Sequence, residues 1–212
     1  MTDTRLKIGI LGAGSIGATA AALFIKAGHS IAISNSRGPD SLTELVAELG
    51  PEATAETAEG AARFGDIILE AIPFGRYRDL PAAAARGKIV MNAANYYVNR
   101  DGTMDLGDLT QSELVAGHLD GARVVKAFNT IYYIHLRDQG DLAKPLPERR
   151  VIPLAGDDDE AKQVVAGLIE AIGFAPLDMG GLRDGGRQME PGQPIYNKDI
   201  TLTQARELLG GQ

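Results

Sequence analysis

The stretch that decides the fold of this chain is Lys7-Ile-Gly-Ile-Leu-Gly-Ala-Gly-Ser-Ile-Gly17. Its first five residues, 7–11, form a short apolar run that is typical of a buried strand in a parallel sheet. An alanine-rich segment, 16–27, follows with strong helix formers, and Gly28 ends it. The stretch therefore predicts a strand, a glycine turn and a helix in immediate succession.

The turn matches the pattern Gly-x-Gly-x-x-Gly through Gly12, Gly14 and Gly17. A preceding strand and a helix that opens within the turn make this pattern specific for dinucleotides; the alternative is a turn that only connects two elements. The first glycine permits the tight turn, the second lets the backbone touch a pyrophosphate, and the third lets helix and strand pack closely. Free N–H groups at the helix N-terminus favour the anion. The residues expected on the dinucleotide are Gly12, Ala13, Gly14, Ser15, Ile16 and Gly17.

The end of the second expected strand, 30–34, distinguishes between the two nicotinamide dinucleotides. In NAD-specific proteins, an Asp or Glu about 20 residues further along the chain binds the ribose 2′-hydroxyl. Here no carboxylate appears before Asp40, and the sequence reads Asn35-Ser36-Arg37. Arg37 offers a planar fork for a phosphate, and its two neighbours offer hydrogen bonds. The sequence favours NADPH over NADH, with an incidental polar turn as the alternative.

Short apolar runs bounded by Gly, Pro or Asn recur along the chain and alternate with helical patterns. The runs expected to be strands are 7–11, 30–34, 66–72, 89–93, 123–128, 151–155 and 175–178. The alternation predicts an α/β fold: a Rossmann-type, doubly wound, mostly parallel sheet of about seven strands in a single domain, 1–212. Helices are expected at 16–27, 42–49, 159–172 and 202–209. A capping box of Ser41 and Glu44 is expected to open the second helix, and 180–200 is expected to be one irregular stretch.

The composition narrows the class of protein. Hydrophobic residues make up 44% and charged residues 23% of the 212 residues, as in ordinary globular proteins. The net charge of −7 argues against nucleic acid and anionic membranes as partners. No apolar run reaches the roughly 18 residues of a membrane span and no signal core is visible, so we expect a cytoplasmic protein. Without cysteine and with three histidines, no metal site is expected.

In an open parallel sheet, ligands bind outside the carboxyl ends of the strands, so the residues after each strand are candidates for the site. The residues expected on the cofactor after the next two strands are Ala71, Ile72, Pro73, Asn92 and Ala93. After 123–128, Asn129 is expected beside the nicotinamide. The residues expected on a small-molecule acceptor are Phe128, Thr130, Tyr132, Tyr133 and His135. The alternative is that Pro and Asn only terminate strands, as they often do.

Together these motifs resemble the deazaflavin-dependent NADP oxidoreductases, which reduce or oxidise coenzyme F420 with NADP(H), and the related cytosolic reductase domain of membrane ferric reductases. The resemblance spans nearly the whole chain. Its most specific parts are Ser36-Arg37 and Phe128-Asn129-Thr130. The stretches that carry it are 8–17, 35–39, 71–73, 124–130 and 178–182, with Arg187 and Glu190.

The resemblance implies an NADP-dependent enzyme whose acceptor is coenzyme F420 or a flavin. It also implies that Ser36 and Arg37 hold the 2′-phosphate, that 13–16 hold the pyrophosphate, and that the loop after Phe128 faces a flat acceptor ring. The loop and closing helix at about 180–212 are expected over the acceptor side, or as an interface arm in a homodimer.

No catalytic residue is demanded by this chemistry, because hydride transfer needs two aligned rings and no nucleophile. Two other functions remain open. One is a non-catalytic NADPH-binding sensor or partner subunit. The other is an imine or carbonyl reductase, which would need an acid such as Tyr132, Tyr133 or His135.

Overall fold

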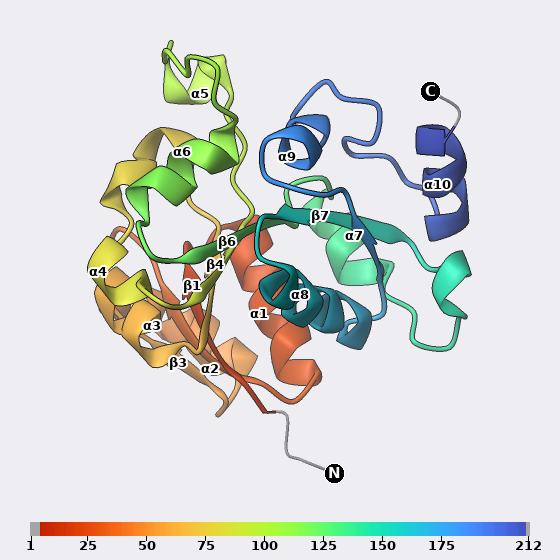
Figure 1. The fold of residues 1–212 in the computed structure, drawn as a ribbon. Helices are drawn as coiled ribbons and strands as arrows, with labels where there is room; N and C mark the ends of the chain where they lie inside the picture. The colour runs from red at the N-terminus through yellow and green to blue at the C-terminus, as the bar shows by residue number, and fades with distance from the viewer. Residues whose placement is uncertain (1–4, 211–212) are drawn as a thin grey trace.

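The computed structural model describes residues 5–210, which form one eight-stranded sheet (Figure 1). The strands are β1 (Lys7–Leu11), β2 (Ser30–Ser34), β3 (Ala53–Ala55), β4 (Ile67–Glu70), β5 (Ile89–Asn92), β6 (Arg123–Ala127), β7 (Val151–Gly156) and β8 (Ala175–Asp178). Their order is β3-β2-β1-β4-β5-β6-β7-β8. All neighbours are parallel except β6 and β7, which are antiparallel with Val125 opposite Gly156. The predicted Rossmann-type, mostly parallel fold is confirmed.

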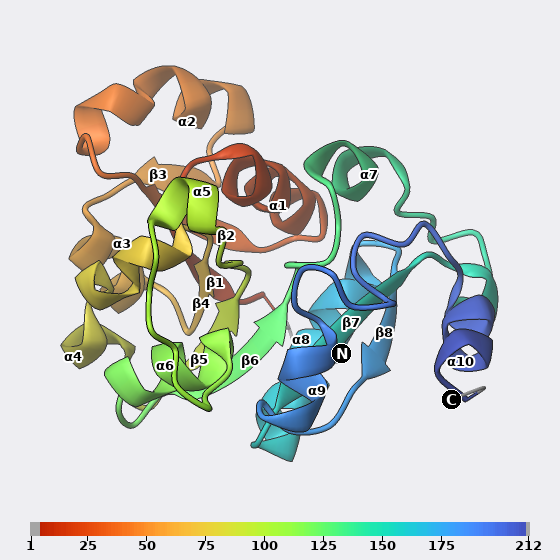
Figure 2. The ribbon, with the colours of Figure 1, turned by 90° about the horizontal axis from the view of Figure 1, so that it is seen from above.

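Helices cover both faces of this sheet (Figure 2). One face carries α1 (Ser15–Lys26), α2 (Thr43–Leu49), α7 (Tyr133–Asp138) and α8 (Asp159–Ala171). The other carries α3 (Ala58–Phe64), α4 (Ala82–Ala85) and α6 (Gln111–His118). The remaining helices are α5 (Val98–Asp101), α9 (Asp184–Gln188), α10 (Leu202–Gly210) and the 3₁₀ turns η1 (Pro39–Leu42), η2 (Phe74–Asp79) and η3 (Leu146–Glu148).

Side chains that alternate along the strands point to opposite faces of the sheet and form a separate hydrophobic core on each face. In β1, Ile8 and Ile10 pack with Phe24 of α1, whereas Leu11 packs on the opposite face with Ile68 of β4. These side chains are at most 3% exposed. Full burial of such a side chain stabilises the fold by roughly 2 kcal/mol. The period-2 pattern of the strands thus fixes which residues can reach the helices on either side.

Three features differ from the sequence-based expectation. An eighth strand, β3, lies at the edge of the sheet, where three small residues carry no apolar run by which to predict it. The predicted capping box is wrong: Leu42 is the N-cap of α2, and Ser41 Oγ instead donates to the carbonyl of Gly38 at 2.7 Å. The stretch 180–200 is not wholly irregular, because α9 lies within it.

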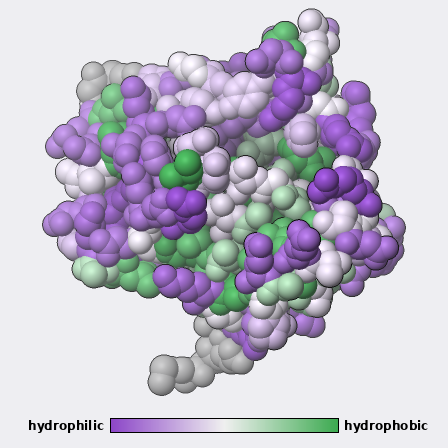
Figure 3. Space-filling model, turned by 180° about the vertical axis from the view of Figure 1, so that it is seen from behind, coloured by the Kyte–Doolittle hydropathy of each residue, from purple (hydrophilic) through white to green (hydrophobic). Residues whose placement is uncertain are grey.

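The surface seen from behind is mostly hydrophilic, with small hydrophobic patches among the polar residues (Figure 3). Among residues 5–210, no helix combines the length and apolar character that a membrane span requires.

Candidate active site

Two adjoining cavities lie along the carboxyl edge of the sheet, at the position between the paired strands β1 and β4 where the strand order reverses direction. The first, here called the β2 cavity, has a volume of about 370 Å³ and is lined by residues that follow β1, β2 and β4. The second, the β6 cavity, has about 480 Å³ and is lined by residues that follow β4, β5 and β6. Both volumes suit a small-molecule ligand. The residues shared by the two cavities are Gly14, Ala71, Ile72 and Pro73.

The glycine loop lies where the cavities meet, and its three glycines have different reasons to be glycine. Gly12 has φ +113°, and a Cβ there would lie 2.5 Å from the carbonyl oxygen of Ala71. A Cβ on Gly17 would lie 1.9 Å from the carbonyl oxygen of Gly12. A Cβ on Gly14 would meet no atom within 4 Å, so this side of the loop is open. The α1 N-terminus has no side-chain cap, which leaves its N–H groups available to an anion.

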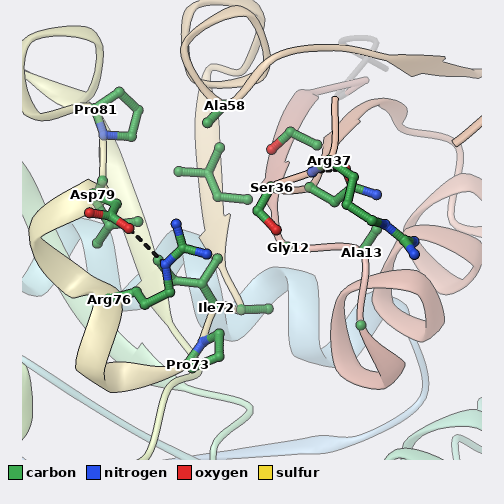
Figure 4. Close-up of a pocket in the computed structure, with 16 residues that line it drawn as sticks. Gly12, Ala13, Ser36, Arg37, Ala58, Ile72, Pro73, Arg76, Asp79 and Pro81 are labelled. Carbon is green, nitrogen blue, oxygen red and sulfur yellow. Dashed lines mark hydrogen bonds and ion pairs between the residues drawn. The ribbon is translucent and has the colours of Figure 1, made fainter. Parts of the chain in front are cut away.

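The loop after β2 presents Arg37 to the β2 cavity. Asn35 shapes this loop, because its Oδ1 accepts the Arg37 backbone N–H at 2.9 Å and its Nδ2 donates to Ser41 at 2.9 Å. No group in residues 5–210 hydrogen-bonds or ion-pairs with the Arg37 guanidinium. Figure 4 shows Arg37 and Arg76 on opposite walls, the latter ion-paired with Asp79 at 2.7 Å. The cavity therefore offers one uncommitted cation for an anionic ligand.

The β6 cavity is built on an unusual backbone. Phe128 has φ +64° and Asn197 has φ +54°, and within the described chain these are the two non-glycine residues in the left-handed region. Both line this cavity. A bulky residue such as Phe128 adopts this conformation at a cost in free energy, and such outliers cluster at functional sites. At the end of β6 the turn directs the next residue, Asn129, into the cavity wall.

Two asparagines form the floor of the β6 cavity. Asn129 Nδ2 donates to Asn95 Oδ1 at 3.0 Å and to the carbonyl of Met189 at 2.7 Å. Asn95 Nδ2 in turn donates to the Asn129 carbonyl at 2.7 Å. The Asn129 Oδ1 atom is buried and accepts no hydrogen bond from residues 5–210. A buried acceptor without a partner is costly, which makes this oxygen a candidate for a ligand N–H.

Tyrosines form the rest of the wall. Tyr97 and Tyr196 hydrogen-bond through their hydroxyl groups, and Asn95 Nδ2 lies 3.4 Å from the Tyr196 hydroxyl. The Arg100 guanidinium lies 5.1 Å from the centroid of the Tyr97 ring and also lines the cavity. Tyr132, which is 50% exposed, stands edge-on to Tyr133, and both line the cavity. The cavity thus combines flat aromatic walls with hydroxyl and amide groups.

Most residues predicted for the site line one of the two cavities. Gly17 does not, because it packs α1 against the glycine turn. The predicted residues in the β2 cavity are Gly12, Ala13, Gly14, Asn35, Ser36, Arg37, Ala71, Ile72 and Pro73. Those in the β6 cavity are Gly14, Ser15, Ile16, Ala71, Ile72, Pro73, Ala93, Phe128, Asn129, Tyr132 and Tyr133.

Three predicted contacts need correction. Asn92 is wholly buried, with its amide donating to Glu70 at 2.5 Å and accepting from Ser112 at 2.7 Å, because its side chain points to the α6 face. Thr130 is 4% exposed and lies outside both cavities. His135 turns away from the cavity and contacts Arg150 at 3.0 Å. The Phe128 ring itself packs on Phe24, so this residue contributes through its backbone turn rather than a free ring face.

Several residues of the site escaped the sequence analysis. Arg76 and Asp79 come from η2, which follows β4 and has no recognisable motif. Tyr97 and Arg100 follow β5, and Tyr196 comes from the distant loop after α9. The only sequence signal for Tyr196 was the polar, proline-rich character of the loop around it, and this character could not indicate which side chain reaches the site.

A row of buried polar residues crosses the sheet beneath the site. Glu70 of β4 pairs in register with Asn92 of β5, which pairs with Lys126 of β6. All three are 0% exposed. Burial raises the pKa of Glu70 to about 7, and burial lowers the pKa of Lys126 to about 8. The Lys126 ammonium makes no hydrogen bond within the described chain, although Glu70 and Glu190 both attract it.

The comparison with protein families matches the part of the chain that carries the glycine loop and the loop after β2. Residues 7–96 match the family of coenzyme F420-dependent NADP oxidoreductases. The match covers less than half of the 212 residues of the chain. The match confirms the resemblance that was stated from the sequence.

Similar proteins extend the match beyond residue 96. The metalloreductase STEAP3 of Rattus norvegicus is 30% identical over 178 residues, which cover 83% of this chain and 34% of that protein. The chain thus spans about a third of the length of this relative. A hypothetical protein of Sinorhizobium meliloti, SMa0349, is 31% identical with TM-score 0.82, covering 95% of this chain and 97% of the other. A structure described as an F420-dependent NADP reductase of Arthrobacter sp. FB24 has TM-score 0.70 at 22% identity, over 97% and 91% of the chains. The last likeness shows the fold.

Proposed function

We propose that this chain is an NADP-dependent oxidoreductase, which binds NADPH across the two cavities and exchanges a hydride between it and a flavin or deazaflavin ring in the β6 cavity. The observation that carries the proposal is the continuity of the cavities at the glycine loop, where both contain Gly14. A dinucleotide has two halves joined by a pyrophosphate. The open side of that loop, at the α1 N-terminus, is where the pyrophosphate would bind.

The polar groups left without partners fit NADPH. The free guanidinium of Arg37 and the hydroxyl of Ser36 would hold the 2′-phosphate, the group that NADH lacks. At the other end, the unpartnered Oδ1 of Asn129 would accept an N–H from the nicotinamide carboxamide. The donors Arg37 and Ser36 would meet phosphate oxygens, and the acceptor Asn129 Oδ1 would meet an amide N–H, so the residues present suit this cofactor.

The aromatic lining of the β6 cavity supports a flat acceptor. Tyr97, Tyr132, Tyr133 and Tyr196 all line it, and rings of this kind stack on planar ligands. NADPH supplies the hydride when bound, and the protein aligns two rings for its transfer. The C-terminal segment supplies Tyr196 and Asn197, which supports its predicted position over the acceptor side. Residues 211–212 of that segment lie outside the described residues.

The test is an anaerobic assay in which NADPH oxidation is followed by its absorbance with FMN, coenzyme F420, a cyclic imine and a ketone as separate acceptors. Turnover with FMN or coenzyme F420, and slower turnover with NADH than with NADPH, is the expected result. Turnover with the imine or ketone alone would favour an imine or carbonyl reductase instead. Tight NADPH binding without turnover of any acceptor would identify a sensor or partner subunit.

A further inference from the structure

The hydroxyl pair of Tyr97 and Tyr196 joins two segments 99 residues apart on the wall of the β6 cavity. Tyr97 leads into α5, and Tyr196 lies in the loop between α9 and α10. Both rings are half-buried, so the pair has one side in the protein and one side in the cavity. One of the two hydroxyl hydrogens is used in the bond between Tyr97 and Tyr196, which leaves the other for a ligand.

The amide neighbours determine the direction of the pair. Asn95 Nδ2 donates to the Tyr196 oxygen at 3.4 Å, and the side chain of Asn197 also hydrogen-bonds to it. A phenol oxygen has two acceptor positions and one hydrogen. Because the amides occupy both acceptor positions, the Tyr196 hydrogen is directed to the Tyr97 oxygen. Burial and this contact raise the pKa of Tyr196, which therefore remains a donor at neutral pH.

The Tyr97 hydroxyl is then the end of the chain of hydrogen bonds. Its oxygen accepts from Tyr196, and no acceptor for its own hydrogen exists among residues 5–210. Donation from Tyr196 also polarises this hydroxyl and strengthens it as a donor. The Arg100 guanidinium lies over the Tyr97 ring and is ion-paired with Asp101 at 2.8 Å, so it fixes this ring without adding net charge to the cavity.

We infer that Tyr97 is a catalytic hydrogen-bond donor, which stabilises the negative charge that an acceptor ring gains with the hydride, and that Tyr196 is its positioning residue. The inference rests on the proposed function and adds to it the group that stabilises the reduced acceptor, a conjugated ring with a nitrogen or carbonyl oxygen on which that charge accumulates. A fixed donor aimed at developing charge favours the charged state over the starting one. The oxidised ring carries no such charge and gains less from the same hydroxyl.

The test compares the binding of oxidised FMN with that of dithionite-reduced FMN, measured anaerobically by flavin fluorescence and absorbance. Tyr97→Phe removes the donor and keeps the ring. We expect it to weaken the binding of reduced FMN by roughly 10- to 100-fold, the loss typical of a hydrogen bond to a charged group, while the Kd of oxidised FMN changes much less. A tenfold difference equals a decrease of about 30 mV in the two-electron potential of bound FMN.

Two further variants make the comparison specific. Tyr196→Phe keeps the Tyr97 donor but removes its orienting bond, so we expect a smaller change in the same direction. Tyr77→Phe is the matched control, because Tyr77 packs on Phe74 outside both cavities and should change neither Kd. Equal losses for both FMN forms in Tyr97→Phe, or no loss, would overturn the inference while wild-type turnover leaves the proposed function intact. If the wild-type protein neither binds FMN or coenzyme F420 nor oxidises NADPH with either of them, the proposed function itself fails, and the inference fails with it.

Discussion

Glu70 and Lys126 lie on either side of Asn92 in one row of the sheet, and both side chains are wholly buried. Asn92 donates to Glu70 Oε2, and the Ile72 backbone N–H donates to Oε1 at 3.1 Å. The Ile72 backbone thus connects this interior row with a residue that lines both cavities. The two titratable groups make the stability of the fold depend on pH in opposite directions.

For Glu70, burial raises the pKa to about 7 from an ordinary 4.5. Between these pH values the folded protein keeps a proton that the unfolded chain has lost, so the free energy of unfolding decreases as the pH rises through this range. We expect Glu70→Gln, which keeps an acceptor for Asn92, to remove this decrease. The decrease amounts to about 3 kcal/mol for a shift of this size. Urea unfolding at a series of pH values measures it, and an unchanged slope in the variant would contradict the assignment.

For Lys126, burial lowers the pKa to about 8 from 10.5. Above pH 8 the folded protein loses a proton that the unfolded chain still holds, so the free energy of unfolding increases as the pH rises towards 10.5. Lys126→Met fills the same space without a charge, and we expect it to abolish this increase. The same urea series checks it. An increase that persists in Lys126→Met would assign it to another group.

Gly14 and Gly17 lie three residues apart but should respond to alanine in opposite ways. A Cβ on Gly14 meets no protein atom within 4 Å, so Gly14→Ala should leave Tm nearly unchanged and weaken NADPH binding about tenfold or more. A Cβ on Gly17 would lie 1.9 Å from the Gly12 carbonyl oxygen, so Gly17→Ala should destabilise the fold by about 3 kcal/mol. Thermal unfolding and NADPH titration distinguish the two. Loss of Tm in Gly14→Ala would show that its role is structural.

Arg37→Ala should discriminate between the two dinucleotides. The free guanidinium faces the β2 cavity, and a hydrogen-bonded ion pair with the 2′-phosphate is worth roughly 1.5–3 kcal/mol. We therefore expect a 10- to 100-fold loss of NADPH affinity and little change for NADH. Arg63→Ala, which removes an exposed arginine paired with Glu59 outside both cavities, is the control. Equal losses for NADPH and NADH in Arg37→Ala would remove Arg37 from this role.

Arg150 links α7 to the C-terminal segment. It is 6% exposed and binds His135 Nδ1 at 3.0 Å, the Lys198 carbonyl at 3.1 Å and Asp199 at 2.9 Å. Arg150→Met leaves these groups without their donor, so we expect a loss of about 3 kcal/mol in the free energy of unfolding. We also expect faster amide hydrogen exchange over residues 195–200.

The control for Arg150 is Arg137→Ala, because Arg137 is exposed and pairs with its neighbour Asp138. Such a surface pair contributes little to stability. Equal protection of residues 195–200 in wild type and Arg150→Met would show that other contacts hold the segment in place.

Prediction from sequence succeeded where local physics determines the outcome. The β1 strand, the glycine loop and the N-terminal start of α1 depend on residues adjacent in the chain, and so does the position of Arg37 in the loop after β2. It failed for Asn92, because which face of the sheet a side chain occupies at the end of a strand depends on the register and on the helix packed above it. It failed for His135 because the partner of this side chain, Arg150, lies in a separate segment, where its backbone forms a β-bridge with Thr201.

The sequence by itself determined the βαβ start, the open glycine loop and the uncommitted cation beside it, because these follow from φ angles, free N–H groups and charges within about thirty residues of one another. Tertiary structure alone decided the β6 cavity. The Tyr97–Tyr196 pair, the unpartnered Asn129 Oδ1 and the left-handed Phe128 arise only when segments far apart in the chain are packed together. Long-range packing specifies which polar atoms lose their partners, and those atoms are the candidate contacts for a ligand.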